Sequence, residues 1–220
     1  MSYPILLNLR GRRVVVVGGG KVGTRKVIDL LNEKALVAVI SPTLHPDLAL
    51  LSDQIDVHPT PYSPGMLESL SSAEQRPVLV FAATDNPEVN RQVAGEARAL
   101  NILVSLANGG ASGDFSSMTA IHRGEIMIAI STGGASPALA AHLRDKLEAH
   151  IGEEYVTLAR WLGELRPLVK AQIPAHARRD LWRAIIASSA LDCLRSGDEA
   201  GARAIIDALI AQAISQNPAT

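Results

Sequence analysis

The sequence predicts a doubly wound α/β domain at the N-terminus, followed by a small β segment and a C-terminal helical domain. Apolar runs alternate with helix-like segments through the first half of the chain. These runs are continuously apolar, which is typical of parallel strands that helices cover on both faces. A glycine-rich stretch also joins the first run to the first helix-like segment.

Five apolar runs predict the strands of this sheet, and the segments between them have helical spacing. The first run ends in glycines, and the second is stopped by Ser41-Pro42. Pro87 suits the first position of a helix, with Asp85 or Asn86 available as its N-cap. We therefore expect strands at 13–17, 36–40, 55–58, 78–83 and 102–106, and helices at 22–32, 46–52, 66–72 and 87–100.

The second half of the chain has a different pattern. Residues 108–119 are rich in Gly, Ser and Ala and predict a loop. Apolar runs at 120–122 and 126–131 then flank the turn Arg123-Gly124-Glu125. Pro167 predicts a kink or break in a helix, and Gly197 precedes the last helix. We expect helices at 137–151, 153–172, 178–189 and 198–215, and three domains comprising residues 1–112, 113–150 and 151–220.

The composition excludes several classes of protein. Hydrophobic residues make up 47% of the chain and charged residues 20%, so a core can form and wholesale disorder is excluded. A net charge of −1 and an aromatic content of 3% predict no basic, base-stacking surface for nucleic acid. The sequence has no apolar run of membrane-spanning length, no recognisable signal peptide, and one cysteine, Cys193. We expect a soluble cytoplasmic protein without nucleic-acid or membrane partners.

The segment Gly18-Gly19-Gly20-Lys21-Val22-Gly23 has the spacing G-x-G-x-x-G between a strand and a helix. In a Rossmann-like domain the first glycine allows a tight turn, the second lets the backbone approach a pyrophosphate, and the third allows close helix–strand packing. Free N–H groups at the helix start then hold the phosphates. A glycine-rich turn without a ligand is the disfavoured alternative. We expect a dinucleotide to contact Gly18, Gly20, Lys21, Val22 and Gly23.

Residues that follow the second and fourth strands complete the expected cofactor site. The acidic residue that usually binds the ribose is absent after the second strand, and no arginine there favours a 2′-phosphate. Two hydroxyls at this point can bond a ribose, so we expect NAD rather than NADP, although an ordinary turn is the alternative. After the fourth strand, Asp85 can contact the ligand or cap the next helix. The expected cofactor contacts are Ser41, Pro42, Thr43, Ala83, Thr84 and Asp85.

A second loop rich in glycine and hydroxyl groups precedes the helix expected at 137–151. Its N–H groups and hydroxyls can receive a carboxylate or phosphate of a substrate. Ser136-Pro137 also matches an N-cap followed by proline, and both roles can hold at once. We expect substrate contacts at Thr132, Gly133 and Ser136. The six histidines lack metal-ligand spacing, so we expect no metal site.

Together these motifs resemble a known family, the precorrin-2 dehydrogenase / sirohydrochlorin ferrochelatase module of sirohaem synthase. The likeness covers nearly the whole chain. Sirohaem synthases often carry a further methyltransferase module, and this chain is similar to the stand-alone form. The resemblance is carried by Pro4-Ile5, Leu9-Arg10, Val16-Val17-Gly18-Gly19-Gly20, Arg25-Lys26, Ala82-Ala83-Thr84-Asp85, Val89-Asn90, Ile130-Ser131-Thr132-Gly133-Gly134-Ala135-Ser136-Pro137, Leu158-Ala159-Arg160, Leu165-Arg166 and Arg178-Arg179-Asp180-Leu181-Trp182.

The resemblance implies a reaction and an assembly. The reaction is NAD-dependent dehydrogenation of precorrin-2 to sirohydrochlorin in sirohaem biosynthesis, followed in some members by insertion of Fe²⁺. The assembly is an intertwined homodimer, with residues 113–131 in the dimer sheet and the C-terminal helices around the substrate cleft. Carboxylates of precorrin-2 can pair with basic side chains. A solvated helix face is nevertheless the better expectation for any single one of Arg123, Arg144, Lys146, Arg160, Arg166, Arg178 and Arg179.

Two positions depart from the family pattern. The aspartate that the family uses in proton removal or metal insertion is replaced by Asn108, and an amide neither takes a proton at neutral pH nor binds Fe²⁺ well. Asp114, a few residues on, is a candidate substitute. Thr132 stands where some relatives carry a phosphorylatable serine. We therefore expect dehydrogenation, whose proton can leave to water or to a substrate carboxylate, to tolerate Asn108 better than metal insertion does.

Three other functions fit the same sequence. They are an NAD(H)-binding regulatory module without turnover, another NAD-dependent dehydrogenase, and a dimeric chelatase that keeps dinucleotide binding as a relic. All three share the fold, because fold alone does not determine function. Absence of precorrin-2 turnover would favour the regulatory module, and a substrate cleft too small for a tetrapyrrole would favour another dehydrogenase. Metal insertion without NAD⁺ would favour the chelatase.

Overall fold

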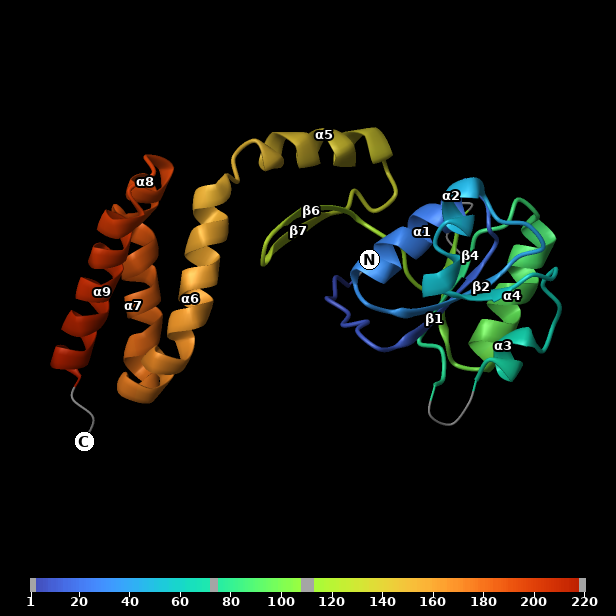
Figure 1. Cartoon of the computed structure of the whole chain (residues 1–220), viewed down its shortest axis with the longest axis horizontal. Coiled ribbons are helices and arrows are strands. Elements are labelled where there is room, and N and C mark those ends of the chain that lie inside the picture. Colours follow the sequence, from blue (N-terminus) through green and yellow to red (C-terminus); the bar gives the residue numbers. More distant parts are fainter. Residues whose placement is uncertain (1–2, 72–74, 108–112, 218–220) are drawn as a thin grey trace. The chain divides into compact units, whose positions relative to one another are not determined.

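The computed structural model describes residues 3–71, 75–107 and 113–217. The chain forms two compact units, Met1–Ser117 and Met118–Thr220 (Figure 1). The first contains a mixed α/β domain, and the second contains a β-hairpin and helices. The division into three domains that we expected from the sequence stays a prediction.

The first unit is built on a five-stranded parallel sheet with the order β3-β2-β1-β4-β5. This order confirms the predicted doubly wound, Rossmann-like fold. After β3 the chain returns to the other side of β1, so the direction of winding reverses between β1 and β4. The strands are β1 (Arg13–Val17), β2 (Leu36–Ile40), β3 (Asp56–His58), β4 (Leu79–Ala82) and β5 (Leu103–Leu106).

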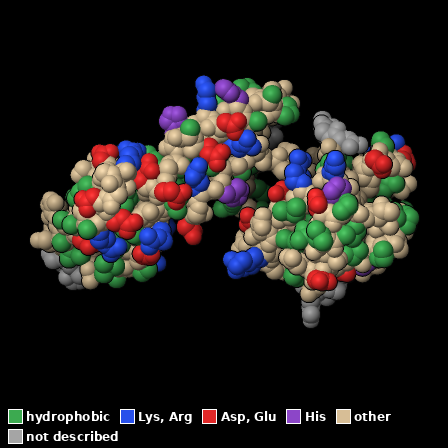
Figure 2. Space-filling model, turned by 45° about the horizontal axis from the view of Figure 1, so that its top comes forward, with side chains coloured by type: hydrophobic (Ala, Val, Ile, Leu, Met, Phe, Trp, Pro, Cys, Tyr) green, Lys and Arg blue, Asp and Glu red, His purple; other side chains and the backbone are tan. Residues whose placement is uncertain are grey.

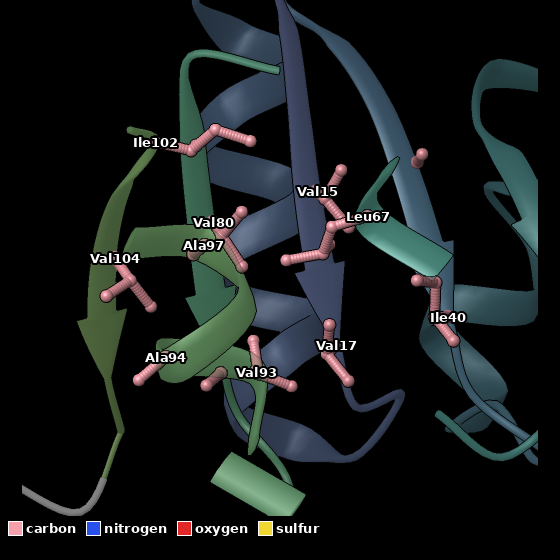
Figure 3. Packing of buried hydrophobic residues seen from close by; sticks show 12 residues of the cluster. Val15, Val17, Ile40, Leu67, Val80, Val93, Ala94, Ala97, Ile102 and Val104 are labelled. Atoms are coloured by element: carbon pink, nitrogen blue, oxygen red, sulfur yellow. The ribbon is translucent and has the colours of Figure 1, made fainter. Parts of the chain in front are cut away.

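Helices cover both faces of this sheet because alternate strand residues point to opposite sides. One face packs against α1 (Lys21–Asn32) and the short α2 (Pro46–Ala49) through a cluster that includes Val27 and Leu48. The other face packs against α3 (Met66–Ser69) and α4 (Pro87–Ala99), with Leu67 and Val93 fully buried (Figure 3). The helix expected at 46–52 is divided into α2 and a 3₁₀ turn at Ser52–Gln54.

The second unit begins with an antiparallel hairpin of β6 (Thr119–Arg123) and β7 (Ile126–Ile130). Gly124 turns the hairpin at a φ of +54°, a backbone conformation that favours glycine. A Cβ at this position would lie 2.6 Å from Cγ1 of Val156, so the turn also requires a residue without a side chain. Helix α5 (Pro137–Glu148) packs on the hairpin.

The remaining helices, α6 (Glu153–Gln172), α7 (Ala175–Ala187), α8 (Ala190–Arg195) and α9 (Glu199–Gln216), share a separate apolar core. The sequence analysis did not anticipate α8, whose six residues are too few for a periodic signal. Helix α6 continues through Pro167, so the break predicted there as one alternative is absent. Pro167 itself is exposed, whereas Trp161, Leu165 and Val169 anchor the helix in the core. Among the helices of the described ranges, none is both long and apolar enough to cross a membrane.

The helical core depends on complete burial of a few branched side chains. Ile206 is 0% exposed within it, whereas Ile186 of α7 is 55% exposed. We expect Ile206→Ala to lower the free energy of unfolding by about 2–5 kcal/mol, because it removes buried methyl groups and leaves a cavity. Urea unfolding followed by tryptophan fluorescence measures this unit alone, since both tryptophans, Trp161 and Trp182, belong to it.

Ile186→Ala is the matched control and should change stability by no more than about 0.5 kcal/mol. Equal losses in the two variants would contradict the packing of α9 against this core.

Candidate functional site

The loops that follow β1 and β4 meet where the strand order reverses. The N–H of Gly18 donates to the carbonyl of Ile40 at 2.9 Å, and the N–H of Ala83 donates to the carbonyl of Val17 at 2.7 Å. The carboxyl ends of β1, β2 and β4 are thereby tied together. In open α/β sheets, ligands bind in the crevice outside the carboxyl ends of the strands at this reversal.

Two glycines of the motif are required by close backbone packing. Gly18 has a φ of +114°, and a Cβ on it would lie 2.4 Å from the carbonyl oxygen of Ala83. A Cβ on Gly23 would lie 2.0 Å from the carbonyl oxygen of Gly18. Neither position accepts a side chain without displacing backbone. The start of α1 is therefore held against the first loop, and the first loop against the β4 loop.

Gly20 differs from these two glycines because a Cβ there would meet no atom within 4 Å. Gly20 is exposed and is the N-cap of α1, and no side chain caps this helix. The first N–H groups of a helix lack acceptors within it and carry partial positive charge. The N–H groups of Lys21, Val22 and Gly23 thus face an open cradle of the kind that accommodates a phosphate group.

Ser41 connects the glycine loop with the end of β2. It is 6% exposed, and its Oγ accepts a hydrogen bond from the Gly19 N–H at 3.0 Å and donates to the Thr43 carbonyl at 2.7 Å. The hydroxyl thus positions the loop, whereas Pro42 and Thr43 beside it are exposed. Of the two hydroxyls expected to bond a ribose, Thr43 provides the accessible one.

Thr84, after β4, is fixed by a residue that the sequence analysis quoted without assigning it a role. Asn90 of α4 is 3% exposed; its Oδ1 accepts the Thr84 N–H at 3.2 Å and the Thr84 hydroxyl at 2.7 Å. The Nδ2 of Asn90 donates to the Thr84 carbonyl at 2.9 Å. Asn90 occupies the apolar stripe of α4 at helical spacing from Val93, Ala94 and Ala97, all buried. A polar residue in such a stripe is the signal that could have identified it.

Asp85 was expected either to cap the next helix or to contact the ligand, and the structure decides the first of these roles. Asn86 is the N-cap of α4, with its Oδ1 accepting the Glu88 N–H at 2.9 Å. Asp85 does not cap the helix, and its side chain is exposed beside the β4 loop. Ala83 and Thr84 are half-buried next to it. Cofactor contact by these three residues stays a prediction.

The two candidate catalytic positions, Asn108 and Asp114, have different outcomes. Asn108 lies outside the described residues. Asp114 lies beside β5, where its Oδ2 accepts the Val104 N–H at 3.0 Å and its Oδ1 accepts Nε of Arg98 at 3.2 Å. One carboxylate oxygen therefore binds the backbone of β5, and the other binds an arginine side chain of α4. These contacts favour a structural role for Asp114 over that of a proton acceptor.

The expected substrate loop lies between β7 and α5 in the second unit. The Ser136 Oγ accepts the Leu139 N–H at 3.1 Å, which confirms its predicted role as N-cap. The Thr132 Oγ1 accepts the Ser136 N–H and donates to the Ser136 carbonyl, both at 3.1 Å. Gly133 and Gly134 are exposed and have φ of +64° and +86°. The hydroxyls thus shape the loop, and its exposed part is the glycine backbone.

Four of the seven basic residues expected near the substrate have acidic or carbonyl partners within the second unit. Arg123 faces Glu148 and Glu153, Arg144 pairs with Asp145, Arg160 pairs with Glu164, and Arg178 donates to the carbonyls of Ile173 and Lys170. Within the part of the chain that the structure describes, no ion pair involves Lys146, Arg166 or Arg179. No group of three or more His, Cys, Asp or Glu side chains suited to a metal gathers among the described residues.

Three family patterns match the chain in succession. Residues 5–118 match a family described as NAD(P)-binding, residues 123–150 match the central region of sirohaem biosynthesis proteins, and residues 154–210 match the sirohaem synthase dimerisation region. The first match covers the whole parallel sheet and both loops of the glycine site. The expected dinucleotide-binding domain is thereby confirmed.

Individual proteins that resemble this chain are also linked to sirohaem synthesis by their names. The chain is 38% identical to the sirohaem synthase of Chromobacterium violaceum over 212 residues, and 38% identical to that of Gluconacetobacter diazotrophicus over 214 residues. These matches cover 95% and 96% of this chain but 44% and 45% of the two relatives, so the chain spans less than half of their length. The solved structure of SirC, a precorrin-2 dehydrogenase, superposes with a TM-score of 0.74 at 26% identity, covering 94% of this chain and 98% of SirC.

The glycine site predicts opposite outcomes for two substitutions. Gly20→Val places a side chain in the open cradle, so we expect at least about a tenfold loss of NAD⁺ affinity. The loss of stability should stay below about 1 kcal/mol, because the new side chain meets no atom and valine is only a poorer N-cap than glycine. Gly23→Ala drives a methyl group into the Gly18 carbonyl and should destabilise the first unit by about 1–3 kcal/mol. Calorimetric titration with NAD⁺ and thermal unfolding measure the two effects. Full affinity in Gly20→Val would exclude the cradle as the phosphate site.

Proposed function

The chain belongs to the sirohaem synthase family, and on that premise we propose that it oxidises precorrin-2 to sirohydrochlorin with NAD⁺. The observation that carries the proposal is the open glycine cradle at the reversal of the strand order. The substrate is proposed from the name of SirC, which matches over nearly its full length.

The cofactor would be held at its pyrophosphate by the exposed backbone of Gly20 and by the N–H groups of Lys21, Val22 and Gly23. Hydrogen bonds of Gly18, Ser41 and Ala83 keep the loops in place around it, and Pro42 and Asp85 are exposed beside these loops. Thr43 offers its exposed hydroxyl to a ribose, and no cationic side chain follows β2 to favour a 2′-phosphate. These features support NAD over NADP. When bound, NAD⁺ supplies the acceptor for the hydride that precorrin-2 loses.

Asn90 and Ser41 act as positioning residues in this proposal. Each is buried, and each uses its polar atoms on the backbone of a loop that borders the crevice. A dehydrogenase depends on orientation of its reactants, and a displacement of about 1 Å can cost on the order of a hundredfold in rate. Fixed loops at β1 and β4 therefore contribute to the rate without touching the reacting atoms.

The proton that leaves precorrin-2 is assigned to water or to a carboxylate of the substrate. Asn108 is an amide, which has no basic lone pair available at neutral pH. Both oxygens of Asp114 are engaged at the edge of the sheet. The proposal therefore requires no protein carboxylate for the dehydrogenation.

The substrate side of the site is proposed in the second unit. Gly133 is exposed in a loop that Thr132 and Ser136 hold in shape by hydrogen bonds. Exposed backbone N–H groups in such a loop can bind a substrate carboxylate. Arg166 and Arg179 are the exposed guanidinium groups that remain for other carboxylates.

Insertion of Fe²⁺ into the product is left out of the proposal. Iron would be a substrate of that step, and it requires a ligand that releases it into the tetrapyrrole. Asn108 replaces the carboxylate that would serve, and an amide is a weak ligand for Fe²⁺. A cytoplasmic location agrees with the single free thiol, Cys193.

We also propose that the protein works as a homodimer. The match of residues 154–210 to a dimerisation region supports it. Leu139, Leu143 and Leu147 are 48%, 38% and 42% exposed and recur every four residues along α5. Met127 of β7 is 44% exposed as well. Large apolar side chains in a row on one helix are typical of a surface that a partner covers, so α5 and the β6–β7 hairpin are assigned to the interface.

Turnover tests the proposed reaction directly. We expect the native chain to convert precorrin-2 and NAD⁺ to sirohydrochlorin and NADH under anaerobic conditions, followed by absorbance. Asn108→Asp should change the rate by less than about tenfold, because the proton has other acceptors.

Turnover in Asn108→Asp but not in the native chain would contradict transfer of the proton to water or to a substrate carboxylate. It would favour an NAD(H)-binding regulatory module as the function of the native chain. Absence of turnover in both, with NAD⁺ still bound, would exclude precorrin-2 as the substrate.

The interface is tested by Leu143→Asp, which places a charge in the leucine row. We expect dissociation into monomers at micromolar concentration in sedimentation-velocity experiments, because an unpaired charge would be buried in the interface. Ala138→Asp, at an exposed position of the same helix outside the row, should remain dimeric. A stable dimer in Leu143→Asp would show that the leucine row lies outside the interface.

A further inference from the structure

A pocket lies at the edge of the parallel sheet opposite the glycine loop. It is about 510 Å³ in volume and is lined by the segments that lead into β1, β4 and β5, comprising residues 11–13, 76–78, 101 and 103. We call it the amino-edge pocket. Arg13, at the start of β1, is separated from the end of that strand by about 13 Å at the usual rise per residue. The pocket is therefore a separate site from the dinucleotide crevice.

The lining of the amino-edge pocket is strongly basic. Among the described residues, the lining includes Arg12, Arg13 and Arg76 and no acidic side chain. Over the face shown in Figure 2, by contrast, acidic and basic side chains are interspersed, and the whole chain has a net charge of −1. Three arginines from two segments about 60 residues apart in the sequence are brought together here by the pairing of β1 with β4. Such a cluster produces a positive potential that a concave surface strengthens.

One arginine is structural and two remain for a ligand. Arg13 donates to the Leu70 carbonyl at 3.3 Å and to Oε1 of Gln75 at 2.9 Å, and its guanidinium lies 3.9 Å from Asp56. Arg12 and Arg76 are exposed, and the structure records no hydrogen bond or ion pair of their side chains with any described residue. Their charges therefore remain available in the pocket.

Compensation of helix dipoles is the other use that arginines at this edge can have, because α1 and α4 end on this side of the sheet. The carbonyls near the end of α4 already have partners: Arg98 O accepts the Asn101 N–H at 2.9 Å, and Ala97 O accepts the Ile102 N–H at 2.8 Å. Neither Arg12 nor Arg76 is recorded as a donor to a helix carbonyl in the described part of the chain. Hydrogen-bonded capping of these helices thus involves neither arginine side chain.

We propose that the amino-edge pocket binds a small anion with two or more phosphate or carboxylate groups. Arg12 and Arg76 would pair with two anionic groups, since a guanidinium matches either oxyanion with paired hydrogen bonds. Asn101 adds an exposed amide that can donate a further hydrogen bond. The volume lies within the usual range for small-molecule sites. This site is independent of the proposed dehydrogenase function.

Calorimetric titration of the full chain with inorganic pyrophosphate and, separately, with citrate tests the proposal at low ionic strength. We expect one saturable site per chain, and affinity at least about tenfold lower in the double variant Arg12→Gln/Arg76→Gln, which loses both charge-assisted pairs. Arg91→Gln is the matched control, because it removes an exposed arginine of the same unit that pairs with Glu88 outside the pocket. Gly20→Val keeps the pocket and blocks the glycine cradle, where pyrophosphate could otherwise bind.

Binding that is lost in the double variant but retained in Arg91→Gln and Gly20→Val supports the pocket. Binding of pyrophosphate without citrate then identifies a phosphate ligand, and the reverse identifies a polycarboxylate. Binding of neither anion, or binding that Gly20→Val abolishes and the double variant retains, overturns the proposal. The single variant Arg76→Gln, expected to bind a few-fold more weakly, repeats the test should the double variant unfold.

Discussion

Backbone-to-backbone contact at Gly18 is the constraint on which the candidate site depends. The first loop approaches the carbonyl of Ala83 on one side and receives the start of α1, through Gly23, on the other. A methyl group at either glycine would lie within 2.4 Å of a carbonyl oxygen, much closer than non-bonded atoms can approach. The absence of two side chains thus fixes the relative position of β1, α1 and β4. It also directs the free N–H groups of α1 toward the edge of the sheet where the winding reverses.

Buried polar side chains preserve this arrangement. Ser41 and Asn90 are buried and direct their polar atoms to the backbone of the loops after β1 and β4. A buried polar group left without a hydrogen bond costs on the order of 1–3 kcal/mol, so each pair has one strongly preferred geometry. Rigid loops follow from this preference. The ligand cradle at Gly20 can therefore remain open without collapsing onto its neighbours.

The sequence predicted the strands closely and the surroundings of the site less well. Strands β1 and β2 begin and end at the predicted residues because both are short runs of apolar, mainly β-branched side chains with sharp stops. Helix α8 and the division of 46–52 into two turns escaped prediction, because such short elements are determined by packing rather than by period. The roles of Ser41 and Asp114 were also inaccessible. Each depends on a backbone group 10 or more residues away in the sequence, which becomes a neighbour only after the sheet has formed.

Asn108 is the reason why dehydrogenation, and not metal insertion, is the proposed reaction. Loss of a hydride from precorrin-2 leaves positive charge on the tetrapyrrole, and that charge makes the remaining proton acidic. A weak acceptor such as water then suffices, so an amide in place of a carboxylate affects this step little. Metal insertion has no comparable assistance, because Fe²⁺ must be held by a ligand before the tetrapyrrole receives it. In the proposed function, asparagine at position 108 therefore affects metal insertion more than it affects dehydrogenation.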